Sequence, residues 1–432
     1  MYYDHFLILL ALNWPWYALF LTLSVLCLVP VFRRYTLSWF DPLRYIVIFA
    51  MLANAIPPFL WVVDQMTTEM FVYFLCSETA LWLGLVAFGG RRESVSGVAI
   101  EGEARFSTYF FLVCFACYVG MTLLSYAMFG IPLFMDKSRL EVYQGSGGFG
   151  ILQRFNGFFS VFSIYFVFHL LHQKAHRVLC YAALGLITVF LVFGGSKSAF
   201  LMLLYAYFGY SYFYLRRAPQ TNRRMFLYLG IGAFLALFIL SFQIARQGGE
   251  ALDTIGGMVA RLIGSGDCYF YAYPNDIYQG VDIGDWFSYL FQGILGPLRL
   301  TSAEDLAPSI GVQLTWLTRP FMAGVETGPN ARMPIYSYIL FGWGGILFAY
   351  LGGLLTSFLL FRLPKYLPGG VIAGGFATYI YISATSFVTD FGLGVTAIFD
   401  ICLNLVFSVG LLYVFTAMTC PRPVGFLSRP GK

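Results

Sequence analysis

Charged residues are scarce in this sequence, and their scarcity argues against a soluble protein. Asp, Glu, Lys and Arg make up 11% of the 432 residues, whereas a soluble domain carries roughly 25%. Hydrophobic residues make up 59%, and the mean hydropathy is +0.74. Apolar runs of about 20 residues recur, and the short alternating segments of a β-barrel are absent. The sequence therefore predicts an all-α integral membrane protein with many spans.

The motifs of nucleotide and metal enzymes are also missing. No Walker loop, GxGxxG turn, HExxH helix or paired CxxC site occurs. Of the four histidines, His169, His172 and His176 cluster at the predicted cytoplasmic end of one span. There a solvated basic turn is favoured over a metal site. We therefore expect no metal and no cofactor, and no histidine acid–base chemistry on the outer face.

The eight cysteines do not form a disulfide pattern. Most lie in apolar runs, and only Cys268 falls in a long polar segment, so no disulfide framework is implied. The CFAC sequence from Cys114 to Cys117 has redox spacing, but it lies inside a predicted span, where core packing is the favoured interpretation. The N-terminus lacks a basic region and a small-residue cleavage site, so we expect the first span to be retained.

About eleven apolar runs are long enough to cross the membrane. The predicted spans are 10–32, 43–63, 70–89, 107–134, 153–171, 178–194, 199–215, 225–245, 336–361, 369–389 and 395–418. One long polar segment between spans 8 and 9 divides the chain into a membrane region over 1–245, a large outer loop over 246–335 and a membrane region with a tail over 336–432. Within the loop, the apolar spacing of 251–264 and 285–296 predicts short helices on the membrane surface.

The basic residues are distributed unevenly between the two sides. Alternate connections, beginning after the first span, hold most of the 26, and the positive-inside rule makes these cytoplasmic. The N-terminus and the long loop are then extracytoplasmic, and the C-terminus is cytoplasmic. The net charge of +5 thus reflects one side of the membrane, and no nucleic-acid partner is expected.

The outer face nevertheless keeps a set of basic residues. These are Arg139, Arg154, Lys197, Arg246, Arg261, Arg299, Arg319 and Arg332. Arginine holds phosphate through two parallel hydrogen bonds, so such a set suits a lipid-linked diphosphate. Lys197, in the GGSKS turn at a predicted helix start, fits the same purpose because exposed N–H groups bind anions there. The alternative is that each residue pairs with a loop acid or snorkels to lipid.

Three carboxylates in the long loop are candidate proton acceptors. Asp267 and Asp276 flank an aromatic stretch, and Glu326 precedes a Gly-Pro turn. A carboxylate in an aromatic-lined cleft has a raised pKa and can take a proton from a sugar hydroxyl. Tyr269 and Tyr273 are candidates to stack on sugar rings. Local capping or pairing of the two aspartates is the alternative.

Three further acids lie in or beside predicted spans. They are Glu78, Asp390 and Asp400. An ionisable residue at such a position is a functional candidate by default. For Asp400 the alternative is that it neutralises a basic neighbour.

Short motifs occur at the turns assigned to the outer face. They are FGIPLF (129–134), RLEVYQGSGGFG (139–150), GGSKS (194–198), GPNARMP (328–334) and YSYILFGWGG (336–345). Together with the late long loop, these motifs resemble the bacterial O-antigen polymerases, the Wzy-type oligosaccharide repeat-unit polymerases. The resemblance covers most of the chain as a layout. It implies a GT-C-like glycosyltransferase of the bacterial inner membrane that joins undecaprenyl-diphosphate-linked repeat units at the periplasmic face, into O-antigen or a related surface polysaccharide.

The resemblance also implies roles for individual residues. Some members carry two Arg-x10-Gly motifs in two outer loops, and Arg139 with Gly150 and Arg246 with Gly257 match that spacing. Arg139 and Arg246 are therefore expected to hold the donor diphosphate during an inverting, metal-independent transfer. The other expected ligands are Arg154, Lys197, Arg261, Arg319 and Arg332, with Asp267, Asp276 or Glu326 as base. The expected partners are the lipid-linked oligosaccharide, the bilayer and a chain-length regulator protein.

Other functions predict different sequences. O-antigen ligases resemble the polymerases but use a histidine in the large outer loop, and this loop has none. A flippase or transporter predicts internal symmetry and charges inside spans. A non-catalytic scaffold leaves the outward arginines unexplained. Under the polymerase hypothesis, Arg139 and Lys197 face the long loop across one cleft.

Overall fold

The computed structural model describes most of the chain. The described residues are 3–89, 104–135, 149–195, 199–217, 219, 264–302, 305–325, 328–367 and 369–419, with isolated positions between 230 and 241. Every regular element in these ranges is a helix, and none is a strand. Eight helical stretches in this part are long and apolar enough to cross a membrane: Trp14–Phe32, Pro42–Val62, Thr68–Val86, Ser107–Phe134, Gly150–His172, Met333–Tyr366, Val371–Thr389 and Phe391–Ser408. The prediction of an all-helical, multi-span membrane protein is confirmed at this level.

These eight stretches correspond to predicted spans 1–5 and 9–11. The sixth prediction falls on α9 (Arg177–Phe193), an apolar helix of 17 residues. The seventh falls on α10 (Ala199–Gly209), which continues into the π-helix η2 (Tyr210–Tyr214). The eighth, 225–245, lies outside the described residues except for isolated helical positions.

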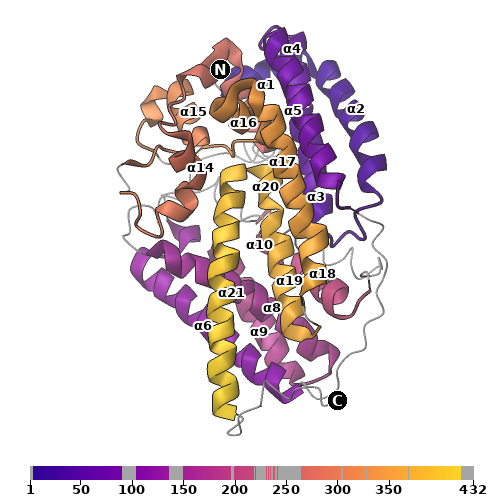
Figure 1. Cartoon of the computed structure of the whole chain (residues 1–432), viewed down its shortest axis with the longest axis vertical. Helices are drawn as coiled ribbons and strands as arrows, with labels where there is room; N and C mark the ends of the chain where they lie inside the picture. The colour runs from indigo at the N-terminus through magenta and orange to yellow at the C-terminus, as the bar shows by residue number, and fades with distance from the viewer. Residues whose placement is uncertain are drawn as a thin grey trace, which may run out of the picture.

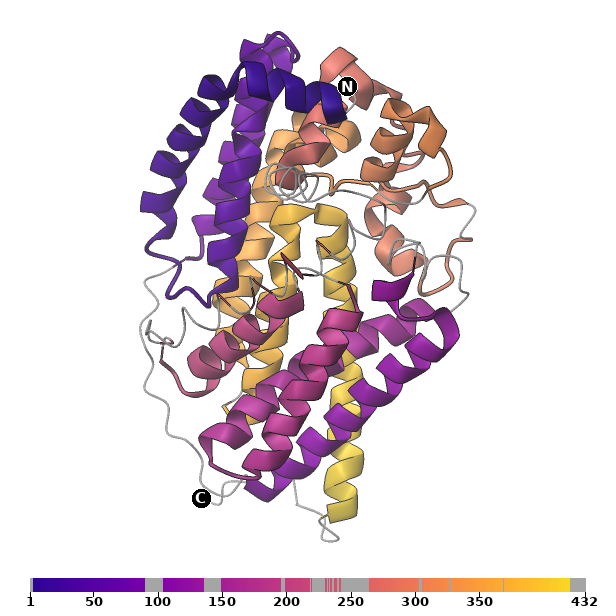
Figure 2. The same ribbon diagram turned by 180° about the vertical axis from the view of Figure 1, so that it is seen from behind.

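The spans form two groups of helices (Figures 1 and 2), and each group packs around a hydrophobic core. The first core joins α2 (Trp14–Phe32), α3 (Pro42–Asn54), α4 (Ile56–Val62), α5 (Thr68–Val86) and α17 (Gly345–Ser357). The second joins α6 (Ala104–Phe129), α8 (Phe149–His172), α9 and α10. Helix α19 (Val371–Ala384) contributes Ala377 and Tyr381 to the first core and Phe376 and Tyr379 to the second. It therefore ties the two groups of spans together.

The buried side chains of the second core test two sequence expectations. Cys114 is fully buried in α6 with a free thiol, so the core-packing interpretation of the CFAC sequence is confirmed for this residue. The solvated basic turn is wrong for His169. This ring has 0% exposure and packs edge-on to Tyr210 and Tyr214, whereas His172 and His176 are exposed. The reason is tertiary, because η2 covers the side of α8 that carries His169.

The described part of the long loop, from Gly264 onward, folds as a layer of short helices at one end of the molecule (Figure 1, top). Its elements are η3 (Gly264–Gly266), α13 (Asp267–Ala272), η4 (Pro274–Gly280), α14 (Trp286–Leu295), α15 (Ile310–Thr318) and η6 (Pro320–Met322). Helix α14 confirms the helix predicted over 285–296: Asp285 caps it by accepting from the Ser288 N–H at 2.8 Å. Trp286 and Phe287 are exposed while Tyr289 and Leu290 are buried, as expected of a helix with one apolar face outward. The predicted helix 251–264 lies outside the described residues, except for Gly264.

The N-terminal segment packs on this same layer. Helix α1 (Tyr3–Leu12) precedes the first span, and its fully buried Phe6 stacks on Phe270 of α13 with ring centroids 4.2 Å apart. Helix α21 (Phe391–Thr419) runs toward the opposite end (Figure 1). We call the end that carries α4, α13, α14 and α15 the loop-bearing end. The N-terminal helix and the long loop thus share one end of the protein, as the charge distribution requires.

The predicted ninth span, 336–361, is not one straight helix. Helix α16 (Met333–Phe341) ends at Gly342, whose φ of 55° turns the chain back into α17. The rings of Tyr336 and Phe348 lie 6.4 Å apart, although a continuous helix would separate residues twelve positions apart by about 18 Å. Only glycine adopts the backbone angles of position 342 at little cost. Helix α16 therefore begins at buried residues inside the bundle, with Met333, Pro334 and Ile335 all buried.

Candidate functional site

A group of polar side chains lies between α5, α13 and the start of α16. It consists of Asn54, Glu78, Trp82, Tyr269, Tyr273 and Arg332, and we call it the Glu78 cluster. Glu78 Oε1 accepts hydrogen bonds from Asn54 Nδ2 and from Trp82 Nε1, the latter at 2.8 Å. The positive charge of Arg332 acts electrostatically on Glu78 and on Tyr269. Residues from three distant parts of the sequence therefore meet here.

Close helix packing fixes the position of Glu78. Helices α5 and α17 touch through Gly84 and Gly353, where an added Cβ would meet the carbonyl oxygens of Tyr350 and Leu81. Glycine permits this backbone approach because it has no side chain. Tyr73, one turn and a half before Glu78, hydrogen-bonds Ser337 of α16 at 2.8 Å. The same helix that carries Glu78 is thus tied to both arms of the α16–α17 hairpin.

Arg332 is the N-cap residue of α16, and it is buried at 5% exposure. Its Nε donates to the Ser265 carbonyl at 2.8 Å. The preceding residue is anchored as well, because Ala331 N–H donates to Asp390 Oδ2 at 3.1 Å. In the described part of the chain no carboxylate lies within ion-pair distance of Arg332. A buried guanidinium with one neutral partner retains donors for an anion.

Tyr269 and Tyr273 line the cluster from α13. Their rings stack on each other with centroids 5.7 Å apart, and they are 0% and 2% exposed. Both hydroxyls are buried, and neither has a hydrogen-bond partner among the described residues. Burial raises the pKa of each phenol well above its ordinary value. Sugar stacking was predicted for these rings, but in this conformation each ring packs on the other. The geometry instead offers a ligand two phenolic hydroxyls.

The other loop residues of the predicted site lie elsewhere. Arg319 ends α15 with its guanidinium 5.5 Å from the ring centre of Tyr271, which helical spacing places on the face of α13 away from Tyr269 and Tyr273. Asp276 adopts a left-handed turn conformation (φ 52°), and its charge acts on Tyr278. Asp267 begins α13 and acts on Cys268. Local roles were the stated alternative for these residues, and this geometry favours them.

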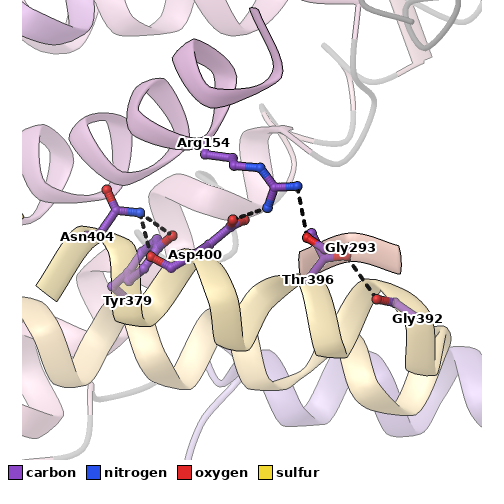
Figure 3. Close-up of polar contacts among 7 residues, drawn as sticks. All are labelled: Arg154, Gly293, Tyr379, Gly392, Thr396, Asp400 and Asn404. Carbon is purple, nitrogen blue, oxygen red and sulfur yellow. Dashed lines mark hydrogen bonds and ion pairs between the residues drawn. The ribbon is translucent and has the colours of Figure 1, made fainter. Parts of the chain in front are cut away.

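Arg154 does not join the Glu78 cluster. It forms an ion pair with Asp400 of α21, and its other nitrogen donates to the Gly293 carbonyl of α14 at 3.5 Å (Figure 3). Asn404 Nδ2 donates to the Asp400 carbonyl at 2.7 Å and to the Tyr379 hydroxyl at 3.2 Å. The alternative that Asp400 neutralises a basic neighbour is confirmed. Arg154 therefore links two spans to a surface helix, and the predicted role as a substrate ligand has no support here.

Five predicted site residues lie outside the described residues. They are Arg139, Lys197, Arg246, Arg261 and Glu326. Their convergence with the long loop therefore stays a prediction. Of the Glu78 cluster, sequence reasoning named Arg332, Tyr269 and Tyr273 and noted Glu78 as an acid within a span. It missed Asn54 and Trp82. The one available signal was an asparagine inside an otherwise apolar run, because such a residue needs a polar partner.

The site is free of metal-ligand groupings. In the residues that the structure describes, no three His, Cys, Asp or Glu side chains come together in a way that could hold a metal ion. The expectation of metal-independent chemistry stays a prediction. Comparison of the chain with protein-family models, curated proteins and solved structures gives no match.

Cys268 should be chemically inert in the folded protein. It is fully buried beside Tyr269, and burial, with the negative charge of Asp267, raises the pKa of its thiol to about 12. Because the thiolate is the nucleophile, a variant that keeps only Cys268 should not react with maleimide at pH 8 in detergent but should react fully in denaturant. The matched control adds Ser302→Cys in an exposed turn, which should react at once. Rapid native labelling of Cys268 would show that α13 is not packed as described.

Proposed function

We propose that this protein is a membrane glycosyltransferase that polymerises lipid-diphosphate-linked oligosaccharide repeat units at its loop-bearing end. The observation that carries the proposal is Arg332, a buried arginine with no carboxylate partner among the described residues. It is the N-cap residue of the folded-back α16. In the same cluster are two phenols whose hydroxyls have no hydrogen-bond partner among the described residues. The layout that resembles the O-antigen polymerases supports the same function.

Arg332 suits the donor diphosphate for physical reasons. Its guanidinium keeps its charge in any surroundings and offers parallel N–H donors to two phosphate oxygens. In a site removed from water, such a fixed charge stabilises the negative charge that grows on the diphosphate as it leaves the sugar. The Ser265 carbonyl accepts from the arginine side chain, and Asp390 accepts from the backbone N–H of the preceding residue, Ala331. Little reorganisation is then needed during transfer.

The surroundings of the site suit a lipid-linked substrate. Trp286 and Phe287 on α14 expose their rings beside the loop layer, and aromatic side chains of this kind lie at the membrane–water interface. In this proposal the polyprenyl tail stays in the bilayer, while the diphosphate and the first sugar reach the Glu78 cluster. The loop-bearing end then faces the periplasm of a bacterial inner membrane. A chain-length regulator protein acts as a further partner.

A flippase for the same lipid-linked sugar is the second candidate. It is favoured by one observation, the charges of Glu78, Arg154 and Asp400 within candidate spans. Transport proteins place such charges along their substrate path. A polymerase uses Glu78 in one fixed site, and the Arg154–Asp400 pair then only joins two spans. The two functions differ in whether a new glycosidic bond is made.

Purified full-length protein should lengthen lipid-linked oligosaccharides without added nucleotide or metal. The substrate pool is extracted from source cells whose copy of the gene is deleted, because a missing polymerase leaves its substrate unpolymerised. The expected result is a ladder of longer glycans on gels, in detergent, with EDTA present. Heat-denatured protein is the control. Movement of the lipid-linked sugar across the membrane of proteoliposomes, without any elongation, would contradict the polymerase hypothesis and support the flippase hypothesis.

A further inference from the structure

Glu78 is the one acid of the Glu78 cluster, and its two carboxylate oxygens differ in their hydrogen bonding. Oε1 accepts both hydrogen bonds, from the Asn54 amide and from the Trp82 indole. No described residue donates to Oε2. The donors are neutral, and each is itself fixed by a helix, Asn54 at the end of α3 and Trp82 one turn further along α5. The carboxylate is therefore held in one orientation with its second oxygen left for another partner.

Other groups of the Glu78 cluster also have unused hydrogen-bonding capacity. Asn54 Oδ1 and the hydroxyls of Tyr269 and Tyr273 are buried, and none of them has a hydrogen-bond partner among the described residues. Buried polar groups are nearly always paired, since each unpaired one costs roughly 1–3 kcal/mol. Arg332 is near enough to act on Glu78 electrostatically, yet the two form no ion pair. The guanidinium and the carboxylate therefore lie beyond ion-pair distance, and each keeps hydrogen-bonding capacity for a polar ligand.

The unpaired groups match the chemistry of a sugar. Phenolic hydroxyls and an amide oxygen donate to and accept from sugar hydroxyls. A carboxylate oxygen accepts a hydroxyl proton, which a guanidinium cannot do. The other two candidate acids interact elsewhere. Asp276 acts electrostatically on Tyr278, and Asp267, the first residue of α13, acts on the neighbouring Cys268. Glu78 is thus the acid that shares a cluster with these unpaired groups.

We propose that Glu78 is the general base of the transfer and that its Oε2 takes the proton of the attacking acceptor-sugar hydroxyl. The inference rests on the proposed function. The acceptor oxygen forms a bond to the anomeric carbon of the lipid-linked donor glycan as the bond from that carbon to the diphosphate oxygen breaks. The electron pair leaves with the diphosphate beside Arg332, the anomeric centre inverts, and the proton ends on Glu78. Asn54 and Trp82 are positioning residues, because they act only through Glu78.

The test is Glu78→Gln in the purified full-length protein. Glutamine keeps an oxygen that accepts from Asn54 and Trp82 but cannot accept the proton. Elongation of the extracted lipid-linked oligosaccharide should fall about 100-fold or more, and binding of undecaprenyl diphosphate, measured by tryptophan fluorescence, should change less than about twofold. In the wild type the elongation rate should rise with pH as the base ionises, and this rise should be lost in Glu78→Gln. The matched control is Glu69→Gln, an exposed acid on the same helix that also accepts an indole N–H, from Trp343 at 3.3 Å; it should keep full activity.

Each outcome decides the proposal. A wild-type rate in Glu78→Gln overturns the role of Glu78 and leaves the polymerase standing, whereas an inactive wild type overturns the polymerase itself. Loss of undecaprenyl diphosphate binding together with activity would make Glu78 a donor ligand and overturn the base assignment. Should Glu78→Gln fail to fold, Glu78→Asp keeps the carboxylate but withdraws it by one methylene. That variant should lose more than about tenfold in rate with normal binding and a retained rise with pH, and an unchanged rate would overturn the proposal.

Discussion

Replacement of Arg332 by alanine should lower the rate of glycan elongation about 100- to 1,000-fold, the loss expected when one fixed donor to a developing negative charge is removed. The side chain is buried and has no acidic partner among the described residues, so its charge is available to a substrate. Lysine at this position keeps the charge but loses the planar fork, so Arg332→Lys should recover only part of the rate. The measurement is the initial rate of ladder formation by purified protein.

The controls for Arg332 separate function from folding. Arg299→Ala removes an arginine of the same loop that is exposed at the loop-bearing end, and it should leave the rate unchanged. Size-exclusion profiles and thermal unfolding midpoints in detergent should show that Arg332→Lys is folded. A folded Arg332→Lys variant with wild-type rate and wild-type binding of undecaprenyl diphosphate would show that the arginine fork of residue 332 does not bind the substrate.

Replacement of Asp400 by alanine should destabilise the protein strongly, by about 3 kcal/mol. Loss of one partner of a buried ion pair leaves the other charge uncompensated, which costs roughly 3–5 kcal/mol, and the partial exposure of this pair places it at the lower end. Arg154 would then lie between α8 and α21 with only the Gly293 carbonyl at 3.5 Å as a polar partner. The thermal unfolding midpoint in detergent reports the loss.

The double variant distinguishes an ion pair from a general packing defect. Removal of both charges, in Arg154→Met with Asp400→Leu, should restore much of the lost stability because no charge is left unpaired. Asp64→Asn, at an exposed turn with φ of 55°, is the matched control and should leave the midpoint unchanged because asparagine also adopts that conformation. A double variant less stable than Asp400→Ala would contradict a charge-based role. Full elongation activity in the stable double variant would also confirm that Arg154 is not a substrate ligand.

Some residues of the predicted site can be recognised from the sequence, and others depend on the packing of helices. Charge and aromatic content single out Arg332, Tyr269 and Tyr273, which do come together. The same reasoning named Arg154 as a substrate ligand, whereas in the structure Arg154 pairs with Asp400 apart from this cluster. The composition of a span does not reveal which helix faces it. Asp400 is 246 positions away along the chain. Pairing over such a distance depends on how α8 and α21 cross.

Two other differences arise from the same cause. The run 336–361 is apolar throughout, so its hydropathy resembles one span, yet the positive φ of Gly342 folds it into a hairpin. Sequence patterns around a glycine do not reveal whether the chain reverses there. For His169, position along the chain predicted a solvated basic turn, but the π-helix η2 covers the ring.

Local sequence is sufficient to predict a helical membrane protein with one large polar loop between its later spans, because hydropathy and charge are summed over each segment separately. The loop arginines and tyrosines are candidate binding groups on the same grounds. Which of these residues share a site depends on the tertiary packing. The fold-back at Gly342 brings Arg332 down to the level of Glu78, and the packing of α5 on α17 sets that acid beside α13. Burial and unpaired hydrogen-bonding groups are properties of such packing, so they are set between segments and not within any one of them.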